Sequence, residues 1–176
     1  MQLVKAGHVV EDRFVRVLDD APLPEGASIL LPATRYLADA AELAGRAAPT
    51  GVLWPNNRKI SELAPTLDRL ALVALIFPSF KDGRAYSQAR QLREIYGFRG
   101  EVRATGDVLR DQFQFLMRAG FDAFEVKKDA DAAAFAAAIA RYSVYYQPTG
   151  KVWSSALQER LARTRTAAQQ AQTLVR

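Results

Sequence analysis

The apolar run from Ala71 to Phe77, ALVALIF, limits most strongly what this chain can fold into. It has the length of a single strand, and it offers no polar position on either face. Strands that are apolar on both faces are typical of parallel sheets covered by helices. The run therefore predicts a central strand of an α/β domain.

Helical patterns alternate with this apolar run and with four other strand-like runs. The expected strands are ASILLP, GVLW, ALVALIF, EVRAT and AFEVK, and the main expected helices cover residues 35–46, 84–96, 108–119 and 130–142. Gly97 and Gly120 follow two of these helices, where a left-handed cap is favoured. Short connections between alternating strands and helices predict one α/β domain with a mainly parallel five-stranded sheet flanked by helices. A full β/α barrel needs about 200 residues or more, so this chain is too short for one.

Composition divides the chain into three parts. Residues 1–27 hold two short strand patterns, QLVK and RFVRV, and a loop rich in proline and glycine, which predict an N-terminal antiparallel ribbon and a connector. Residues 28–148 are the expected α/β core domain. Residues 149–176 are expected to form a basic tail, helical or partly disordered, whose apolar stripe ends early. A homo-oligomer built through this C-terminal helix is one hypothesis for its role.

Charge and cysteine content exclude several classes of function. The tail has five basic residues against Glu159 alone, so it carries +4 of the formal net charge of +5. Because the remainder is nearly balanced, no nucleic-acid partner is expected. The chain has no cysteine, which excludes disulfides and cysteine-ligated iron–sulfur clusters and fits a reducing compartment. With no secretory signal and no apolar stretch of membrane-spanning length, a cytoplasmic protein without a membrane partner is expected.

Three consecutive strand-to-helix junctions, FPSFKDGR, RATGD and VKKD, share a pattern. Each places an aspartate before a helix, Asp82, Asp107 or Asp129, with basic residues nearby. The carboxyl ends of parallel strands meet at one edge, where ligands commonly bind. The aspartates fit N-caps, and the helix N-termini with the neighbouring cations also fit a cradle for a small anion. The candidate cradle consists of Lys81, Asp82, Gly83, Arg84, Arg103, Gly106, Asp107, Arg110, Gln112 and Lys127.

Sequence signatures of common enzymes are absent. The chain has no glycine-rich dinucleotide fingerprint after a strand, no phosphate-binding loop, no GxSxG elbow and no HExxH pair. The only histidine, His8, lies in the expected ribbon, away from the three junctions. We therefore expect no cofactor and no metal, and the sequence assigns no catalytic residue.

The stretch from Phe77 to Glu125 resembles the bacterial domain of unknown function 934, and a looser similarity extends from Ile29 to Tyr146. Members of that family are described as oxidoreductases or accessory proteins of sulfite reduction. They are commonly encoded beside genes for sulfate activation and assimilatory sulfite reduction. The resemblance implies the same association for this chain and transfers no catalytic residue.

Two hypotheses from different classes follow. The six-electron reduction of sulfite needs a haem or iron–sulfur centre, and a chain with no cysteine and one histidine cannot supply it. In the first hypothesis, the protein is a non-catalytic accessory that docks on sulfite reductase or another sulfur-assimilation protein. In the second, it is a small enzyme or binding module for a sulfo- or phospho-anion at the three junctions.

Overall fold

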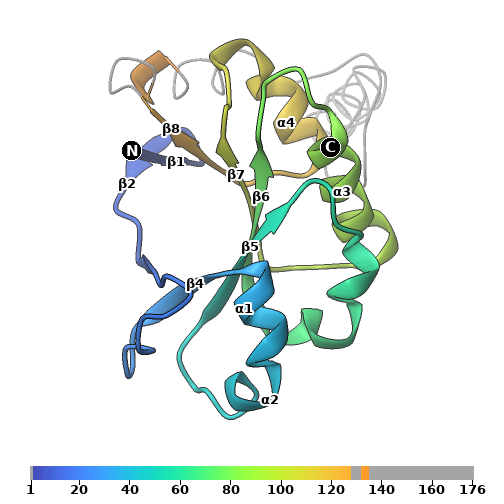
Figure 1. The fold of residues 1–176 in the computed structure, drawn as a ribbon. Helices are drawn as coiled ribbons and strands as arrows, with labels where there is room; N and C mark the ends of the chain where they lie inside the picture. Colours follow the sequence, from blue (N-terminus) through green and yellow to red (C-terminus); the bar gives the residue numbers. More distant parts are fainter. Residues whose placement is uncertain (1, 128–131, 135–176) are drawn as a thin grey trace, which may run out of the picture.

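The computed structural model describes residues 2–127 and 132–134, and its centre is a sheet that curls around one open side (Figure 1). Across the sheet, the strands lie in the order β2-β1-β8-β7-β6-β5-β4-β3. Their bounds are β1 Gln2–Lys5, β2 His8–Val10, β3 Phe14–Arg16, β4 Ser28–Pro32, β5 Thr50–Pro55, β6 Leu70–Phe77, β7 Glu101–Gly106 and β8 Ala123–Val126.

Short helices connect the strands. The α-helices are α1 Ala33–Ala38, α2 Ala40–Leu43, α3 Arg84–Arg90 and α4 Phe113–Ala119. The 3₁₀ helices are η1 Ile60–Glu62, η2 Ala64–Arg69 and η4 Arg110–Gln112, and a π-helical turn, η3 Gln91–Ile95, continues α3. Gly97 and Gly120 have positive φ angles of 63° and 105°, which confirms the caps predicted after two helices.

The parallel part of the sheet follows the order of the chain. Strands β3 to β8 are parallel neighbours in sequence order, and β1 pairs antiparallel with both β8 and β2. Each right-handed crossover moves one strand in the same direction, so the helices fall on one face. Figure 1 shows α1, α3 and α4 together on that face. No helix of the described residues covers the opposite, concave face, which is lined by side chains of the strands.

The prediction of five strands is too low. The five expected strands are present as β4 to β8, but the sheet has eight strands within the described residues. QLVK pairs with residues 8–10 in a hairpin rather than with RFVRV, and Phe14–Arg16 pairs in parallel with β4 at the far edge. Strands of three or four residues carry too little local pattern to specify their partners, so long-range contacts decide the pairing.

The two faces of the sheet hold different side chains. The helix-covered face forms the main apolar core, which includes Trp54, Val73 and Phe77. The concave face holds a small separate cluster around Leu30 and Leu72. Of the helix expected over residues 130–142, only residues 132–134 are described, and the tail of residues 149–176 lies outside the described residues.

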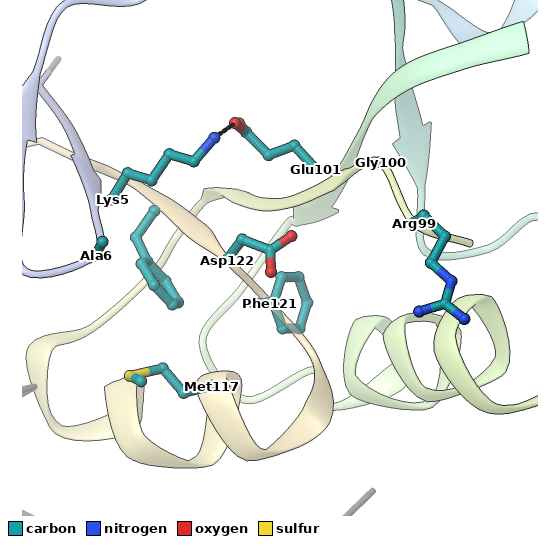
Figure 2. Close-up of a pocket in the computed structure, with 9 residues that line it drawn as sticks. Lys5, Ala6, Arg99, Gly100, Glu101, Met117, Phe121 and Asp122 are labelled. Atoms are coloured by element: carbon teal, nitrogen blue, oxygen red, sulfur yellow. Dashed lines mark hydrogen bonds and ion pairs between the residues drawn. The ribbon is translucent and has the colours of Figure 1, made fainter. Parts of the chain in front are cut away.

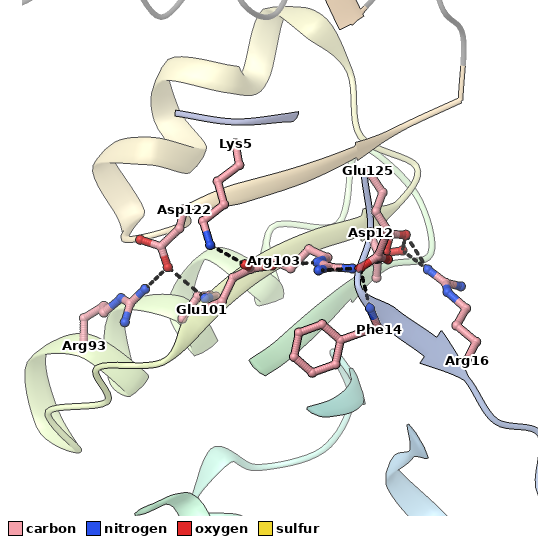
Figure 3. Close-up of polar contacts among 11 residues, drawn as sticks. Lys5, Asp12, Phe14, Arg16, Arg93, Glu101, Arg103, Asp122 and Glu125 are labelled. Carbon is pink, nitrogen blue, oxygen red and sulfur yellow. Dashed lines mark hydrogen bonds and ion pairs between the residues drawn. The ribbon is translucent and has the colours of Figure 1, made fainter. Parts of the chain in front are cut away.

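A buried arginine dominates the concave face (Figure 3). The side chain of Arg103 in β7 is 1% exposed, and its guanidinium binds Asp12 through two bonds of 2.7 and 3.1 Å. It also donates to Glu101 at 2.8 Å and to Glu125 at 3.3 Å. Burial alone would lower the pKa of Arg103, but the Asp12 and Glu101 carboxylates outweigh it and raise the pKa.

These bonds hold the N-terminal segment against the sheet. Residues 11–13 connect β2 at one edge to β3 at the other, so they cross the open side of the curl (Figure 1). Asp12 in this crossing segment binds Arg103, and Arg16 in β3 reaches Glu125 in β8. The charged side chains therefore join the crossing segment and the edge strand β3 to the interior strands β7 and β8.

Replacing Arg103 by methionine should destabilise the fold strongly, because it leaves Glu125 and its neighbouring carboxylates without their central cation. Breaking a buried ion pair on one side typically costs about 3–5 kcal/mol. The matched control is Lys5→Gln, which removes a 48% exposed cation from Glu101 and should cost less than about 1 kcal/mol. Urea unfolding followed by circular dichroism measures the free energy of unfolding of both variants. Equal destabilisation of the two would contradict the role given to Arg103.

Candidate functional site

The loops that follow β6, β7 and β8 lie together at the carboxyl ends of these strands (top of Figure 1). We call this surface the junction edge, and it comprises residues 78–83, residues 107–109 and Lys127. Eight of the ten residues in the predicted cradle belong to it or border it directly. Its contacts decide whether the charges there are free for a ligand.

Asp107 connects all three loops. Its backbone N–H donates to the carbonyl oxygen of Phe77 at 2.8 Å, at the end of β6. Its carboxylate accepts a bond of 3.1 Å from the backbone N–H of Phe80 and one of 3.3 Å from Nζ of Lys127. The Phe80 N–H, followed by Lys127, lowers the pKa of Asp107. The carboxylate therefore organises the neighbouring loops.

Asp82 and Arg84 neutralise each other at the start of α3. The Asp82 carboxylate accepts bonds from the Arg84 backbone N–H at 3.2 Å and from the Arg84 guanidinium at 2.6 and 3.0 Å. The side-chain bonds from Arg84 hold the pKa of Asp82 well below its usual value. Gly83 between them precedes α3 directly. Lys81 is exposed, and its ammonium lies 5.6 Å from the centre of the Phe80 ring.

Gly106 is explained by the close approach of two backbones. Its φ angle is 96°, and a Cβ atom at this position would lie 2.4 Å from the carbonyl oxygen of Phe77. The sequence allows either a tight turn or an approach to a ligand. The structure shows that Gly106 brings the end of β7 against the end of β6, which places Asp107 for its bond to Phe77.

Gln112 holds the backbone of two apolar residues of the junction edge. Its Nε2 donates to the carbonyl oxygen of Phe80 at 2.7 Å, and its Oε1 accepts a bond of 3.3 Å from the Leu109 backbone N–H. Phe80 and Leu109 remain 40% and 38% exposed. Neither was among the predicted site residues, although Phe80 stands in the otherwise polar loop PSFKDG, which was the available signal.

The structure does not bring every predicted cradle residue together. Lys81, Asp82, Gly83, Arg84, Gly106, Asp107, Gln112 and Lys127 gather at the junction edge. Arg103 lies on the concave face, where three carboxylates surround it. The Arg110 side chain and the whole of Asp129 lie outside the described residues, so the N-cap predicted at Asp129 stays a prediction. Asp82 accepts a bond from the first backbone N–H of α3, as an N-terminal cap does, but the N-cap predicted at Asp107 is wrong, because its carboxylate binds Phe80 and Lys127.

Residues 2–127 and 132–134 hold neither a metal-binding cluster nor a membrane-spanning helix. No group of three or more His, Cys, Asp or Glu side chains in this part of the chain is arranged to hold a metal ion. Within the same residues, no helix combines the length and the hydrophobicity that crossing a bilayer requires.

Substitution of Gly106 by alanine should destabilise the protein more than substitution of Gly26. Both glycines have positive φ angles, which cost a non-glycine residue roughly 1–2 kcal/mol. An alanine at Gly26 meets nothing within 4 Å, so only this cost is expected there. At Gly106 the clash with Phe77 should add about 1–3 kcal/mol. Urea unfolding of the two variants tests this. Equal decreases in the free energy of unfolding would show that the Phe77 backbone moves aside without destabilising the fold.

Comparison with known proteins places the chain in a family. No curated protein matches the sequence. Residues 51–156, more than half of the chain, match the family described as bacterial protein of unknown function, DUF934. The matched segment begins in β5 and contains β6, β7, β8 and the whole junction edge. The chain therefore belongs to this DUF934 family of bacterial proteins.

Proposed function

We propose that this protein is a cytoplasmic accessory protein of assimilatory sulfate and sulfite reduction, and that it acts by docking through the junction edge to the sulfite-reducing machinery. Membership of the family supports the proposal, because the resemblance from Phe77 to Glu125 implies an association with sulfite reduction. The partner we propose is sulfite reductase itself.

The observation that carries the proposal is the exposure of Phe80 and Leu109 on a surface that is held in place. The Gln112 side chain bonds the backbone of both residues, and Asp107 bonds the Phe80 N–H. Apolar and aromatic side chains at the centre of an interface contribute most of the binding free energy. Because the backbone of both residues is already held, little backbone entropy is lost when a partner covers them.

The charges around Phe80 and Leu109 suit the rim of an interface. Asp82 pairs with Arg84, and Asp107 pairs with Lys127, so both carboxylates and two of the cations have partners within the chain. Polar, partly exposed groups of this kind surround the apolar centre of typical protein interfaces. The arrangement favours recognition of a protein surface.

The alternative is a small enzyme or binding module for a sulfo- or phospho-anion at the same edge. An anion there would have to compete with the Asp82 carboxylate for Arg84 and with Asp107 for Lys127. The exposed ammonium of Lys81 is the observation that favours this alternative. The contacts of Arg84 and Lys127 support docking more strongly.

Replacing both apolar residues, in the variant Phe80→Ser with Leu109→Ser, should weaken binding to purified assimilatory sulfite reductase. Loss of two interface anchors should raise Kd at least about tenfold, which corresponds to about 1.4 kcal/mol. The two side chains are exposed loop residues, so the folded state should be retained. Sedimentation velocity with labelled protein measures the affinity.

The matched control is Ile95→Ser, which removes a 71% exposed apolar side chain from the far end of the α3–η3 helix. This variant should bind like the wild type. Failure of the wild-type protein to bind sulfite reductase would reject that partner, and equal weakening by Ile95→Ser would reject the junction edge as the docking surface.

A further inference from the structure

A second surface lies at the opposite end of β7 and β8. An open pocket of about 450 Å³ is formed where the strands begin, between the β1–β2 turn, the start of β7 and the loop that connects α4 to β8 (Figure 2). Its volume is in the range of small-molecule binding sites, about 300–1,000 Å³. None of the residues that line it belongs to the junction edge.

The floor of the pocket is apolar. Phe121 and Phe124 are almost fully buried, and the side chain of Met117 approaches from α4 (Figure 2). The Phe121 ring packs against Phe77 and Tyr86, with ring centres 5.9 and 6.4 Å away, so it is held rigidly. Methionine, in contrast, adapts its unbranched side chain to the shape of a ligand. This floor suits an apolar body of variable shape.

The carboxylates beside the pocket are already neutralised within the chain. Glu101 accepts bonds from Lys5 at 2.7 Å and from Arg103 at 2.8 Å, one on each oxygen. Asp122 pairs with Arg93 and also accepts a bond of 2.9 Å from the Val102 backbone N–H. A cationic ligand would meet the positive charge of Lys5, Arg93 and Arg103 beside these carboxylates.

The cations at the pocket have N–H donors that are not used by the neighbouring carboxylates. The Lys5 ammonium has three N–H donors, of which the bond to Glu101 uses one, and the side chain is 48% exposed. Arg99 is exposed and lines the other side of the pocket (Figure 2). An anionic group could therefore accept bonds at the rim while Glu101 and Asp122 keep their partners.

We propose that this pocket binds a small amphipathic organic anion. Its apolar body lies on Met117, Phe121 and Phe124, and its carboxylate or sulfonate group accepts hydrogen bonds from Lys5 or Arg99. The site is separate from the junction edge, so it is independent of the docking function proposed above.

The test uses three probes that share one apolar body and differ in charge: octanoate, octanol and octylammonium. Titration of the isotope-labelled full chain, followed by amide NMR shifts, should show saturable octanoate binding that maps to Ala6, Gly100 and Asp122. Octylammonium should bind at least about tenfold more weakly, because a hydrogen bond to a charged group contributes about 1.5–3 kcal/mol. The affinity for octanol should lie between those for octanoate and octylammonium.

Variants separate the headgroup from the apolar floor. Lys5→Gln with Arg99→Gln should weaken octanoate binding about tenfold and leave octanol binding unchanged. Met117→Trp should fill the pocket and weaken the binding of both octanoate and octanol. The control Arg90→Gln removes an exposed cation of α3 outside the pocket and should change neither affinity. Absence of octanoate binding, equal affinity for octylammonium, or shifts that map elsewhere would overturn the proposal.

Discussion

The Arg103 guanidinium binds residues 11–13, which connect the two edge strands β2 and β3, to the interior strands β7 and β8. Asp12 in this crossing segment has a bidentate bond to Arg103, while Glu101 and Glu125 bind the same group from β7 and β8. The crossing segment has little apolar packing to fix it, since Val9 and Val15 on either side of it are half exposed. A buried ion network contributes less net stability than apolar residues of similar volume. Its effect here is also geometric: Glu101 and Glu125 lie on β7 and the adjacent β8, whereas Asp12 reaches Arg103 only because the sheet curls.

That curl places two surfaces at opposite ends of the same strands. At the carboxyl ends, Gly106 and Asp107 hold the loops that present Phe80 and Leu109. At the amino ends, the bond between Arg103 and Glu101 leaves Glu101 in place to pair with Lys5 beside the pocket. A six-residue strand such as β7 spans roughly 20 Å, so one ligand does not cover both surfaces. The rigid strands between them would keep their spacing constant whether or not either surface is occupied.

Local pattern was sufficient to predict much of this arrangement from the sequence. The apolar run that became β6, the strands on either side of it and the glycine caps at Gly97 and Gly120 all depend on residues close together in the chain. The convergence of the three junctions followed from the rule that parallel strands end at one edge. Strand partners at residues 8–16, and the pairing of Arg84 with Asp82 or of Lys127 with Asp107, depend on three-dimensional position. Sequence alone therefore identified the edge but not the state of its charges.

The position of Arg103 on the concave face could have been predicted from the alternation of polar and apolar residues in its strand. In EVRAT, polar residues Glu101, Arg103 and Thr105 alternate with Val102 and Ala104, so one face of this strand is polar. A doubly wound sheet has helices on both faces and requires both to be apolar. The alternation therefore already argued for helices on one face only, and for an arginine that points into the opposite face instead of toward the strand end. The same register pairs Arg103 with Ala74 and Glu101 with Leu72. Charged side chains can line this concave face because they satisfy one another, and their mutual pairing makes a curled sheet with helices on one side a stable solution for this sequence.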